Sequence, residues 1–320
     1  MPRPSRLPWP LPPPLPLNAE AVRLGDVVCH VAGQGPPLLL VHSVNAAASA
    51  HEVRPLLNHW RQTHTVFAPD LPGFGSSVRR QQRYTPRLMT DALHAVSALV
   101  QQRCAGAPMG ALAVSLGCEF LARAAAERPA DYRRLALVSP TGLNGTAARR
   151  GAPGSTRAVP GLHAVLTAPL WRRPLFRALT RPGVVRDFLE RPWGRKAIDE
   201  TMWADAVRAA QAPGAEHAPL SFLSAGLFSA DVLSLYEALT QPVWASHGVR
   251  GDFTDYRGQV HLSSRPNWRF TVFDSGALPY FEHPADFNRQ LQQFLHTDDA
   301  ITAATAATAA SAAAVGSSGA

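Results

Sequence analysis

Short apolar runs that alternate with segments of helical periodicity are the feature that most constrains the fold of this chain. Apolar residues recur at helical spacing over 53–60, 88–100 and 119–126. The runs with the length and composition of strands are 27–31, 37–42, 65–68, 111–114 and 135–138. Residues 37–42 are almost continuously apolar, as in a strand that is buried on both faces. Strands separated by helices of this length predict a doubly wound, mostly parallel α/β sheet.

The alternation stops at Thr141 and resumes near Pro242. Between these points the sequence has helical patches broken by proline and glycine, with no clear strand. Strand-like runs return at 242–245 and 270–273, and a helix is expected over 284–295. Parallel sheets bind ligands beyond the carboxyl ends of their strands. The simplest interpretation of 141–239 is therefore a helical lid over that edge of the sheet.

Both ends of the chain have compositions that do not support a core. Residues 1–17 contain eight prolines, which exclude the unbroken apolar helix of a signal peptide, and 298–320 are rich in alanine, threonine and serine. The expected organisation is two disordered tails, a core formed by 18–140 and 240–297, and the lid. No apolar run reaches the roughly 18 residues that a membrane span needs, so we expect a cytoplasmic protein.

Charge and cysteine content exclude several functional classes. The chain has 31 basic residues, 30 of them arginine, against 23 acidic residues, for a net charge of +8. The arginines are scattered and do not form a stripe interleaved with aromatic residues, so no nucleic-acid partner is expected. Three widely spaced cysteines fit neither a disulfide framework nor a zinc site. We expect no metal and no cofactor.

Ser115 is the strongest candidate for chemistry. It follows the apolar run 111–114 and precedes the helical segment that begins near Glu119. A serine on a sharp strand-to-helix turn exposes its hydroxyl beside helix N-terminal N–H groups that can stabilise an oxyanion. The small residues Ala113 and Gly117 allow such a turn to pack closely. The alternative is a serine that only caps a helix, which the position after a strand disfavours.

Several motifs in the right order give the chain a resemblance to the α/β-hydrolase family, over about residues 24–296. The most specific is Asp-Leu-Pro-Gly-Phe-Gly-Ser-Ser at 70–77. The others are Leu-Leu-Val-His-Ser at 39–43, Ala-Val-Ser-Leu-Gly at 113–117, and Val-Trp-Ala-Ser-His-Gly at 243–248 followed by Asp252. The resemblance implies the α/β-hydrolase fold, with the helical lid inserted after the sixth strand.

The resemblance also implies roles for individual residues. Ser115 is the expected nucleophile, and the N–H groups of Val44 and Leu116 form the expected oxyanion hole. Asp252 is the expected catalytic acid, with Asp255 in reserve. Ser43 and Asn45, in the loop that carries Val44, are the expected substrate-binding residues.

The catalytic base is where the chain departs from the family. The position aligned with the usual histidine is Ala277, and Tyr280 follows three residues later. His283 is the only imidazole in this segment, so it is the expected base if the turn takes a different path. The alternative is that His283 only begins the last helix. His42, His51 and His247 are better explained as structural or exposed residues.

Two functions follow. The first is a serine hydrolase whose partner is a small-molecule carboxylic ester, or related acyl compound, with an apolar acyl or alcohol part. The second is a catalytically impaired hydrolase-fold protein that binds a hydrophobic small molecule or a partner. The presence of a histidine within reach of Ser115 distinguishes them. A dehalogenase-like enzyme is disfavoured because it needs a carboxylate where this chain has Ser115.

Overall fold

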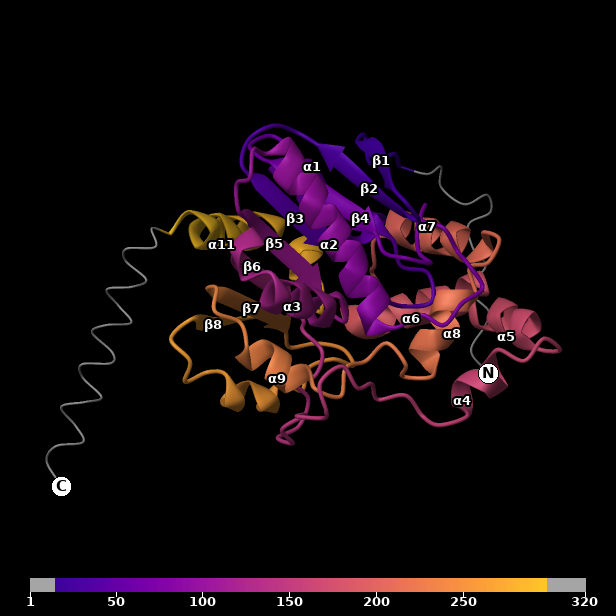
Figure 1. Cartoon of the computed structure of the whole chain (residues 1–320). Coiled ribbons are helices and arrows are strands. Elements are labelled where there is room, and N and C mark those ends of the chain that lie inside the picture. Colours follow the sequence, from indigo (N-terminus) through magenta and orange to yellow (C-terminus); the bar gives the residue numbers. More distant parts are fainter. Residues whose placement is uncertain (1–14, 298–320) are drawn as a thin grey trace, which may run out of the picture.

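An eight-stranded sheet forms the centre of the computed structural model, which describes residues 15–297 (Figure 1). The strand order is β1-β2-β4-β3-β5-β6-β7-β8. The pairs β1–β2 and β2–β4 are antiparallel, and every later pair is parallel. The predicted doubly wound, mostly parallel sheet is confirmed. The strands are β1 Glu20–Leu24, β2 Val27–Ala32, β3 Pro37–Val41, β4 Thr65–Asp70, β5 Met109–Val114, β6 Tyr132–Val138, β7 Val243–Gly248 and β8 Trp268–Phe273.

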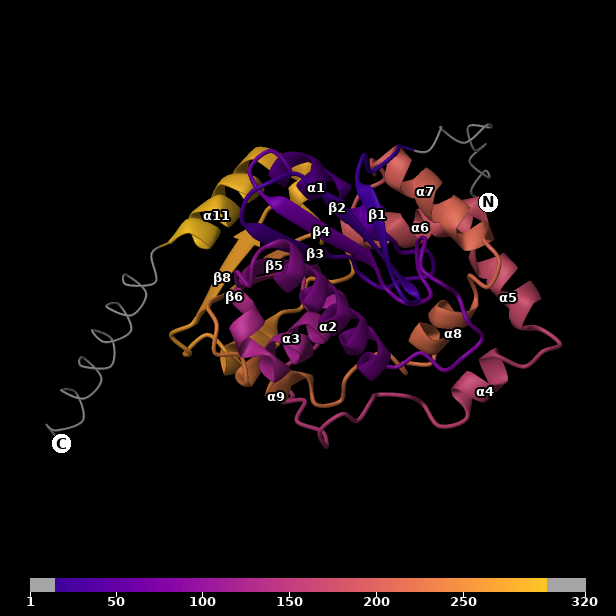
Figure 2. The ribbon, with the colours of Figure 1, turned by 45° about the horizontal axis from the view of Figure 1, so that its top comes forward.

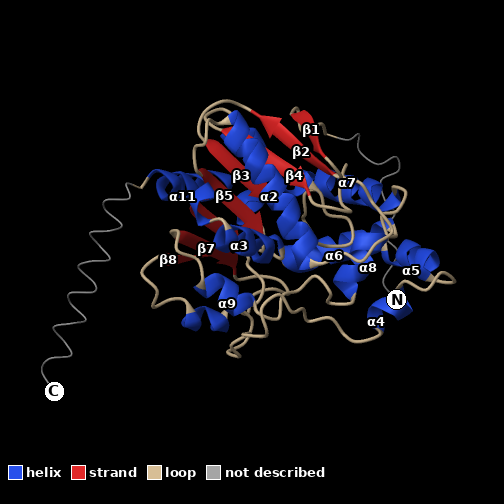
Figure 3. Ribbon diagram, in the orientation of Figure 1, coloured by secondary structure: helices blue, strands red, loops and turns tan. Residues whose placement is uncertain are grey.

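Helices connect the strands and cover the sheet (Figure 3). The α-helices are α1 Arg54–Trp60, α2 Pro86–Arg103, α3 Gly117–Glu127, α4 Leu162–Leu166, α5 Arg172–Leu179, α6 Pro182–Trp193, α7 Glu200–Gln211, α8 His217–Leu223, α9 Val232–Glu237, α10 Pro279–Glu282 and α11 Pro284–His296. Three short 3-10 helices complete the described part: η1 Ala50–Val53, η2 Pro129–Asp131 and η3 Arg257–His261.

The two faces of the sheet support separate apolar cores. Because side chains alternate along a strand, Leu39 and Val41 of β3 enter one core and Leu38 and Leu40 enter the other. The first core includes side chains of α2, α3 and α9, and the second includes those of α1, α10 and α11. This double covering explains why β3 and β5 are apolar along their whole length.

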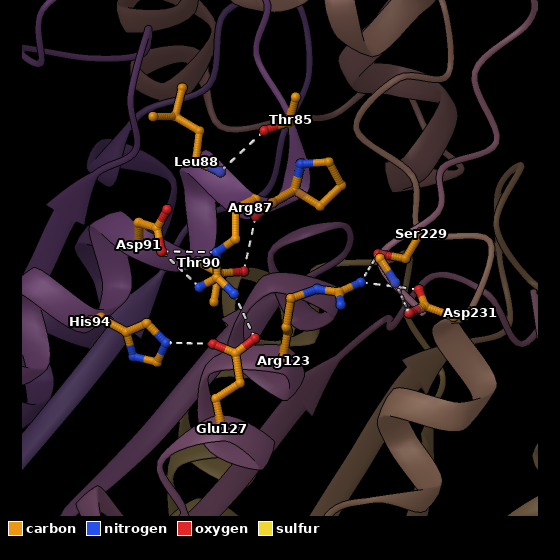
Figure 4. Close-up of polar contacts among 12 residues, drawn as sticks. Thr85, Arg87, Leu88, Thr90, Asp91, His94, Arg123, Glu127, Ser229 and Asp231 are labelled. Carbon is orange, nitrogen blue, oxygen red and sulfur yellow. Dashed lines mark hydrogen bonds and ion pairs between the residues drawn. The ribbon is translucent and has the colours of Figure 1, made fainter. Parts of the chain in front are cut away.

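Polar contacts join α2 to α3 on the first face (Figure 4). Thr85 caps α2 by accepting a hydrogen bond from the Leu88 N–H at 3.2 Å. Glu127, at the end of α3, accepts from Arg87 at 2.6 Å and contacts the His94 ring at 2.7 Å. The helix that precedes β5 and the helix that follows it are therefore fixed against each other.

Six helices, α4–α9, occupy the segment between β6 and β7, which we call the helical insertion. The arrowheads of β4 and β5 point toward the side on which α6, α7 and α8 lie (Figure 3). The same helices stay at that end of the sheet in the tilted view (Figure 2). The part of the helical insertion formed by α6, α7 and α8 therefore lies at the carboxyl end of these strands, whereas α9 packs in the first core with α3.

Some elements were not predicted from the sequence. Strand β1 pairs with β2 at the edge of the sheet, and the four-residue helix α10 precedes α11. Leu17, placed by the sequence in the N-terminal tail, is only 6% exposed and belongs to the second core. The predictions for 1–14 and 298–320 lie outside the described residues. Within residues 15–297, no helix combines the length and apolar character that crossing a membrane requires.

Candidate functional site

Ser115 occupies the turn between β5 and α3 in a strained backbone conformation. Its φ is +50°, in the left-handed region that non-glycine residues seldom adopt. The turn is held by the Ser115 N–H, which donates to Val138 O at 2.8 Å, and by the Ser115 carbonyl, which accepts from the Cys118 N–H at 3.0 Å. The residue is half-buried, and no described side chain hydrogen-bonds its hydroxyl. A strained serine in a turn between a strand and a helix is the backbone arrangement expected of a nucleophile, whereas an activated serine also needs a base within hydrogen-bond reach.

Small residues on either side make this turn possible. A Cβ atom at position 117 would lie 2.5 Å from the carbonyl oxygen of His42, so only glycine fits there. Ala113 is fully buried and pairs with Val41 on one side and Leu137 on the other. The close contact between Gly117 and His42 brings the start of α3 against the end of β3.

The oxyanion-hole candidates lie on the two segments that meet at this contact. Leu116 precedes the first turn of α3, and Val44 follows the end of β3 by three residues. Neither N–H has a hydrogen-bond acceptor among the described residues. Free N–H groups at a helix N-terminus stabilise negative charge.

His42 fixes the loop that carries Val44, which we call the oxyanion loop (residues 42–49). Its Nε2 accepts from the Leu71 N–H at 3.0 Å, so Nδ1 carries the proton and donates to Ser43 O at 2.5 Å. Burial lowers the pKa of His42, which favours this neutral form. Both ring nitrogens are engaged, and the histidine has a structural role.

Glu52 binds the oxyanion loop from η1. Its carboxylate accepts from the Ser43 N–H at 2.5 Å and from the Ser43 hydroxyl at 2.7 Å. Glu52 is only 5% exposed, and burial raises its pKa from 4.5 to about 7. Asn45 closes the next turn by accepting from the Ala47 N–H at 2.7 Å. Ser43 thus binds Glu52 of η1 and Asn45 bonds within the loop, and the contact of both residues with substrate stays a prediction.

Glu119 is a second buried carboxyl, one turn after Ser115. It accepts from the Thr141 hydroxyl at 2.5 Å and from the Ser229 N–H at 2.7 Å. Burial raises its pKa to about 7. Arg123, on the same helix, reaches Asp231 at 3.0 Å (Figure 4). Helix α3 is therefore bound to the helical insertion at two places. Sequence reasoning missed both glutamates, because a glutamate in a helical segment usually faces solvent.

The oxyanion loop also contacts the helical insertion through η1. His51 Nδ1 lies 3.0 Å from Asp205 Oδ2 of α7, and Arg54 lies 3.2 Å from Asp199. Asp205 is 8% exposed. The imidazole next to the oxyanion loop thus faces a buried carboxylate, a contact that the sequence did not reveal.

The candidate acids lie at the surface. Asp252 is exposed, and its Oδ2 lies 4.0 Å from Arg191 Nε. Asp255 accepts from Arg257 at 2.9 Å and from the Gly145 N–H at 2.9 Å. The hydrogen bond from Arg257 holds the pKa of Asp255 below its usual range. Neither carboxylate contacts an imidazole among the described residues.

The segment after β8 does not bring an imidazole to the Ser115 hydroxyl. Ala277 is buried, donates its N–H to Pro192 O and accepts from the Ser139 hydroxyl, both at 2.7 Å. His283 is exposed, and its Nε2 lies 3.0 Å from Asp274 O. His247, at the end of β7, stacks on Tyr256 with ring centroids 3.9 Å apart. The roles predicted for Asp252 and His283 remain predictions.

A cavity of about 360 Å³ lies beside α4 and α8, and Ser115 is not among the residues that line it. Arg83, Tyr84, His163 and Ser221 contribute to its wall. Within the described residues no cluster of histidine, cysteine, aspartate or glutamate is arranged to hold a metal ion.

A match to a sequence profile shows the family of this chain. Residues 36–211, more than half of the chain, match the sequence profile of the alpha/beta hydrolase fold. The chain belongs to the α/β-hydrolase fold family. A comparison with curated proteins gives no match.

Several solved structures share the fold of this chain at low sequence identity. Cfl2 from Burkholderia cenocepacia is 20% identical with a TM-score of 0.65, over 86% of this chain and 95% of that one. A meta-cleavage product hydrolase from Pseudomonas fluorescens is 17% identical with a TM-score of 0.63, over 84% and 93%. The epoxide hydrolase CorEH is 20% identical with a TM-score of 0.64, over 86% and 97%. At these identities the likeness concerns the fold.

Proposed function

We propose that this α/β-hydrolase is a serine hydrolase that acts on a carboxylic ester, or related acyl compound, with an apolar part. The observation that carries the proposal is Ser115, held at φ +50° in the turn between β5 and α3. The N–H groups of Val44 and Leu116, which have no acceptor in residues 15–297, belong to the two segments that meet beside it.

The reaction would proceed in two steps. The Ser115 hydroxyl attacks the ester carbonyl carbon while a base takes its proton, and the N–H groups of Val44 and Leu116 stabilise the tetrahedral oxyanion. The alcohol leaves with that proton, and Ser115 carries the acyl group. Water then attacks the acyl-enzyme, which releases the carboxylic acid and restores the Ser115 hydroxyl.

The preference for an apolar substrate rests on the side chains that share a core with the oxyanion loop. Val44 and Leu116 belong to the same apolar cluster as Leu143 and Leu227. The partly buried rings of Phe222 and Phe228 pack against this cluster, 5.3 Å apart. In our proposal the helical insertion acts as a lid, and these side chains line the acyl-binding side of the site.

A specific observation favours the second candidate, a protein that binds a hydrophobic small molecule without rapid turnover. No imidazole hydrogen-bonds the Ser115 hydroxyl among the described residues. In our sequence interpretation the position of the family's histidine is Ala277, which is buried. Loss of a triad member leaves only about 10³–10⁴-fold catalysis over water. We therefore expect slow hydrolysis of short or medium acyl esters.

Labelling with a fluorophosphonate probe tests the proposal. Wild-type protein should be labelled and should hydrolyse p-nitrophenyl acyl esters, and Ser115→Ala should do neither. Ser221→Ala is the matched control, because Ser221 hydrogen-bonds the His163 ring at 3.2 Å and lies in the separate cavity. Labelling that survives in Ser115→Ala but is lost in Ser221→Ala would overturn the assignment of the nucleophile.

Histidine variants then separate the two candidate functions. If His283 is the base, His283→Ala should abolish turnover and Asp252→Asn should reduce it. His51→Ala is the second arm, because His51 faces the buried carboxylate of Asp205. If neither histidine matters and Ala277→His raises turnover by orders of magnitude, the natural protein lacks a base and the binding function is favoured.

A further inference from the structure

An apolar ridge surrounded by arginines projects from the helical insertion. Figures 1 and 2 both place α4 and α5 at the periphery of the molecule, at the end opposite α11. Val165 of α4 is 55% exposed, and Leu170 and Trp171 in the connection to α5 are 82% and 44% exposed. We call these three residues the α4–α5 ridge. Apolar side chains this exposed, in one short segment, indicate a surface that another molecule covers.

The ridge is held in place by a specific contact. The Trp171 indole N–H donates to the Val165 carbonyl at 2.8 Å, which joins the start of α5 to α4. This bond satisfies the polar end of the indole, although nearly half of the side chain remains in solvent. The exposed apolar surface is therefore preorganised.

Positive charge flanks the ridge with little compensation. Residues 160–181, which contain the ridge, hold four arginines (Arg172, Arg173, Arg177 and Arg181) and neither aspartate nor glutamate. Among the described residues, the acid that forms ion pairs with α5 is Glu216, directly before α8, at 3.8 Å from Arg172 and 3.4 Å from Arg173. Arg177 and Arg181 are exposed, and neither forms an ion pair with a described residue. The surface around the ridge thus keeps a net positive charge.

We infer that the α4–α5 ridge docks on an anionic lipid surface. Proteins that bind at a membrane interface combine exposed leucine and tryptophan side chains with arginines that have no acidic partner. The apolar groups enter the headgroup region, and the cations face lipid phosphates. A soluble acidic partner would account for the arginines but not for Leu170, which is 82% exposed in the connection between α4 and α5. This inference is independent of the chemistry at Ser115.

Co-sedimentation of the full chain with vesicles tests the inference. The protein should bind vesicles that contain phosphatidylglycerol far more than vesicles of phosphatidylcholine alone, and salt should weaken the binding. Arg177→Ala combined with Arg181→Ala should lower the partition coefficient by about tenfold or more. Leu170→Ser combined with Trp171→Ser should lower it by a similar factor.

Matched variants control for charge and apolar surface in general. Arg23→Ala with Arg269→Ala removes two exposed cations from the edge strands β1 and β8, and Val272→Ser alters a residue of β8 that is 54% exposed. Both controls should bind as the wild type does. Brominated lipid should quench tryptophan fluorescence in the wild type, and this quenching should be largely lost in Trp171→Phe.

Three results would overturn the inference. One is a protein that sediments equally with anionic and neutral vesicles, or with neither kind. A soluble acidic partner would then explain the arginines. Another is binding that the ridge variants leave unchanged. The third is quenching that persists in Trp171→Phe.

Discussion

At the scale of single residues, Ser115 shows strain where chemistry is proposed. A left-handed backbone conformation lowers the stability of the folded state by about 1 kcal/mol for a residue with a side chain, but not for glycine. We therefore expect Ser115→Gly to be more stable than Ser115→Ala by about 1 kcal/mol in chemical denaturation, although neither is labelled by a fluorophosphonate.

Ser97, in the interior of α2, provides the opposite control for this comparison. Ser97→Gly should be less stable than Ser97→Ala by about 1 kcal/mol, because glycine disfavours a helix. A Ser115→Ala protein as stable as Ser115→Gly would show that the turn relaxes and stores no strain.

Glu52 provides a prediction about pH. Burial raises its pKa from 4.5 to about 7, so the folded state binds the extra proton through this window. The free energy of unfolding should fall as pH rises from about 4.5 to 7, by on the order of 3 kcal/mol from this group. Glu52→Gln should remove that part of the fall, because glutamine does not titrate. Glutamine can still accept from the Ser43 N–H and donate to the Ser43 hydroxyl, so the loop contact is kept.

The control for this titration is Glu20→Gln. The hydrogen bond from Arg103 lowers the pKa of exposed Glu20, so its titration lies below the same window. This variant should keep the full fall in stability between pH 4.5 and 7. Urea denaturation at several pH values measures the effect. If the free energy of unfolding of Glu52→Gln falls with pH as steeply as that of the wild type, Glu52 is charged in the folded protein at neutral pH.

At the scale of elements, the link between α3 and the helical insertion carries the next prediction. Asp231 is 3% exposed and accepts from Arg123 at 3.0 Å and from the Gly154 N–H at 2.7 Å. Asp231→Asn leaves the Arg123 charge unpaired in a largely buried place, which should cost about 3 kcal/mol. The melting temperature should fall by several degrees.

Asp91 of α2, which is labelled in Figure 4, is the matched control. It pairs with Arg87 at 2.8 Å, but its side chain is 60% exposed. Exposed pairs contribute about 0–1 kcal/mol, so Asp91→Asn should leave the melting temperature almost unchanged. Equal effects of the two variants would mean that water reaches Arg123.

At the scale of the whole molecule, the pattern of apolar residues was sufficient to predict the central strands of the sheet. The runs at 37–42, 65–68, 111–114 and 135–138 are β3 to β6, because strands buried on both faces must be apolar throughout. Strand β1 was missed because Glu20–Leu24 lies at the sheet edge with mixed polarity. Its identity as a strand depends on its pairing with β2, which no local pattern shows.

The candidate site was predictable only where backbone geometry dictates residue type. Gly117 and Ala113 mark the Ser115 turn because larger side chains do not fit there. Glu52 and Glu119 carry no such mark, since their burial depends on partners that are distant in sequence, such as Ser43 and Ser229. The position of an imidazole relative to Ser115 likewise depends on the path of the whole segment after β8.

The limits of the folded unit give the last prediction. Leu17 is 6% exposed in the second core, whereas the sequence of 1–14 offers no large apolar face beside its prolines. Deleting residues 1–14 together with 298–320 should leave the melting temperature unchanged, and extending the N-terminal deletion through Leu17 should lower it. The loss should correspond to about 2 kcal/mol, the value of burying one leucine side chain. Leu17→Ala in the full chain should reproduce most of that loss in a thermal melt. If the shorter deletion already causes the whole decrease, residues before Leu15 also pack on the core.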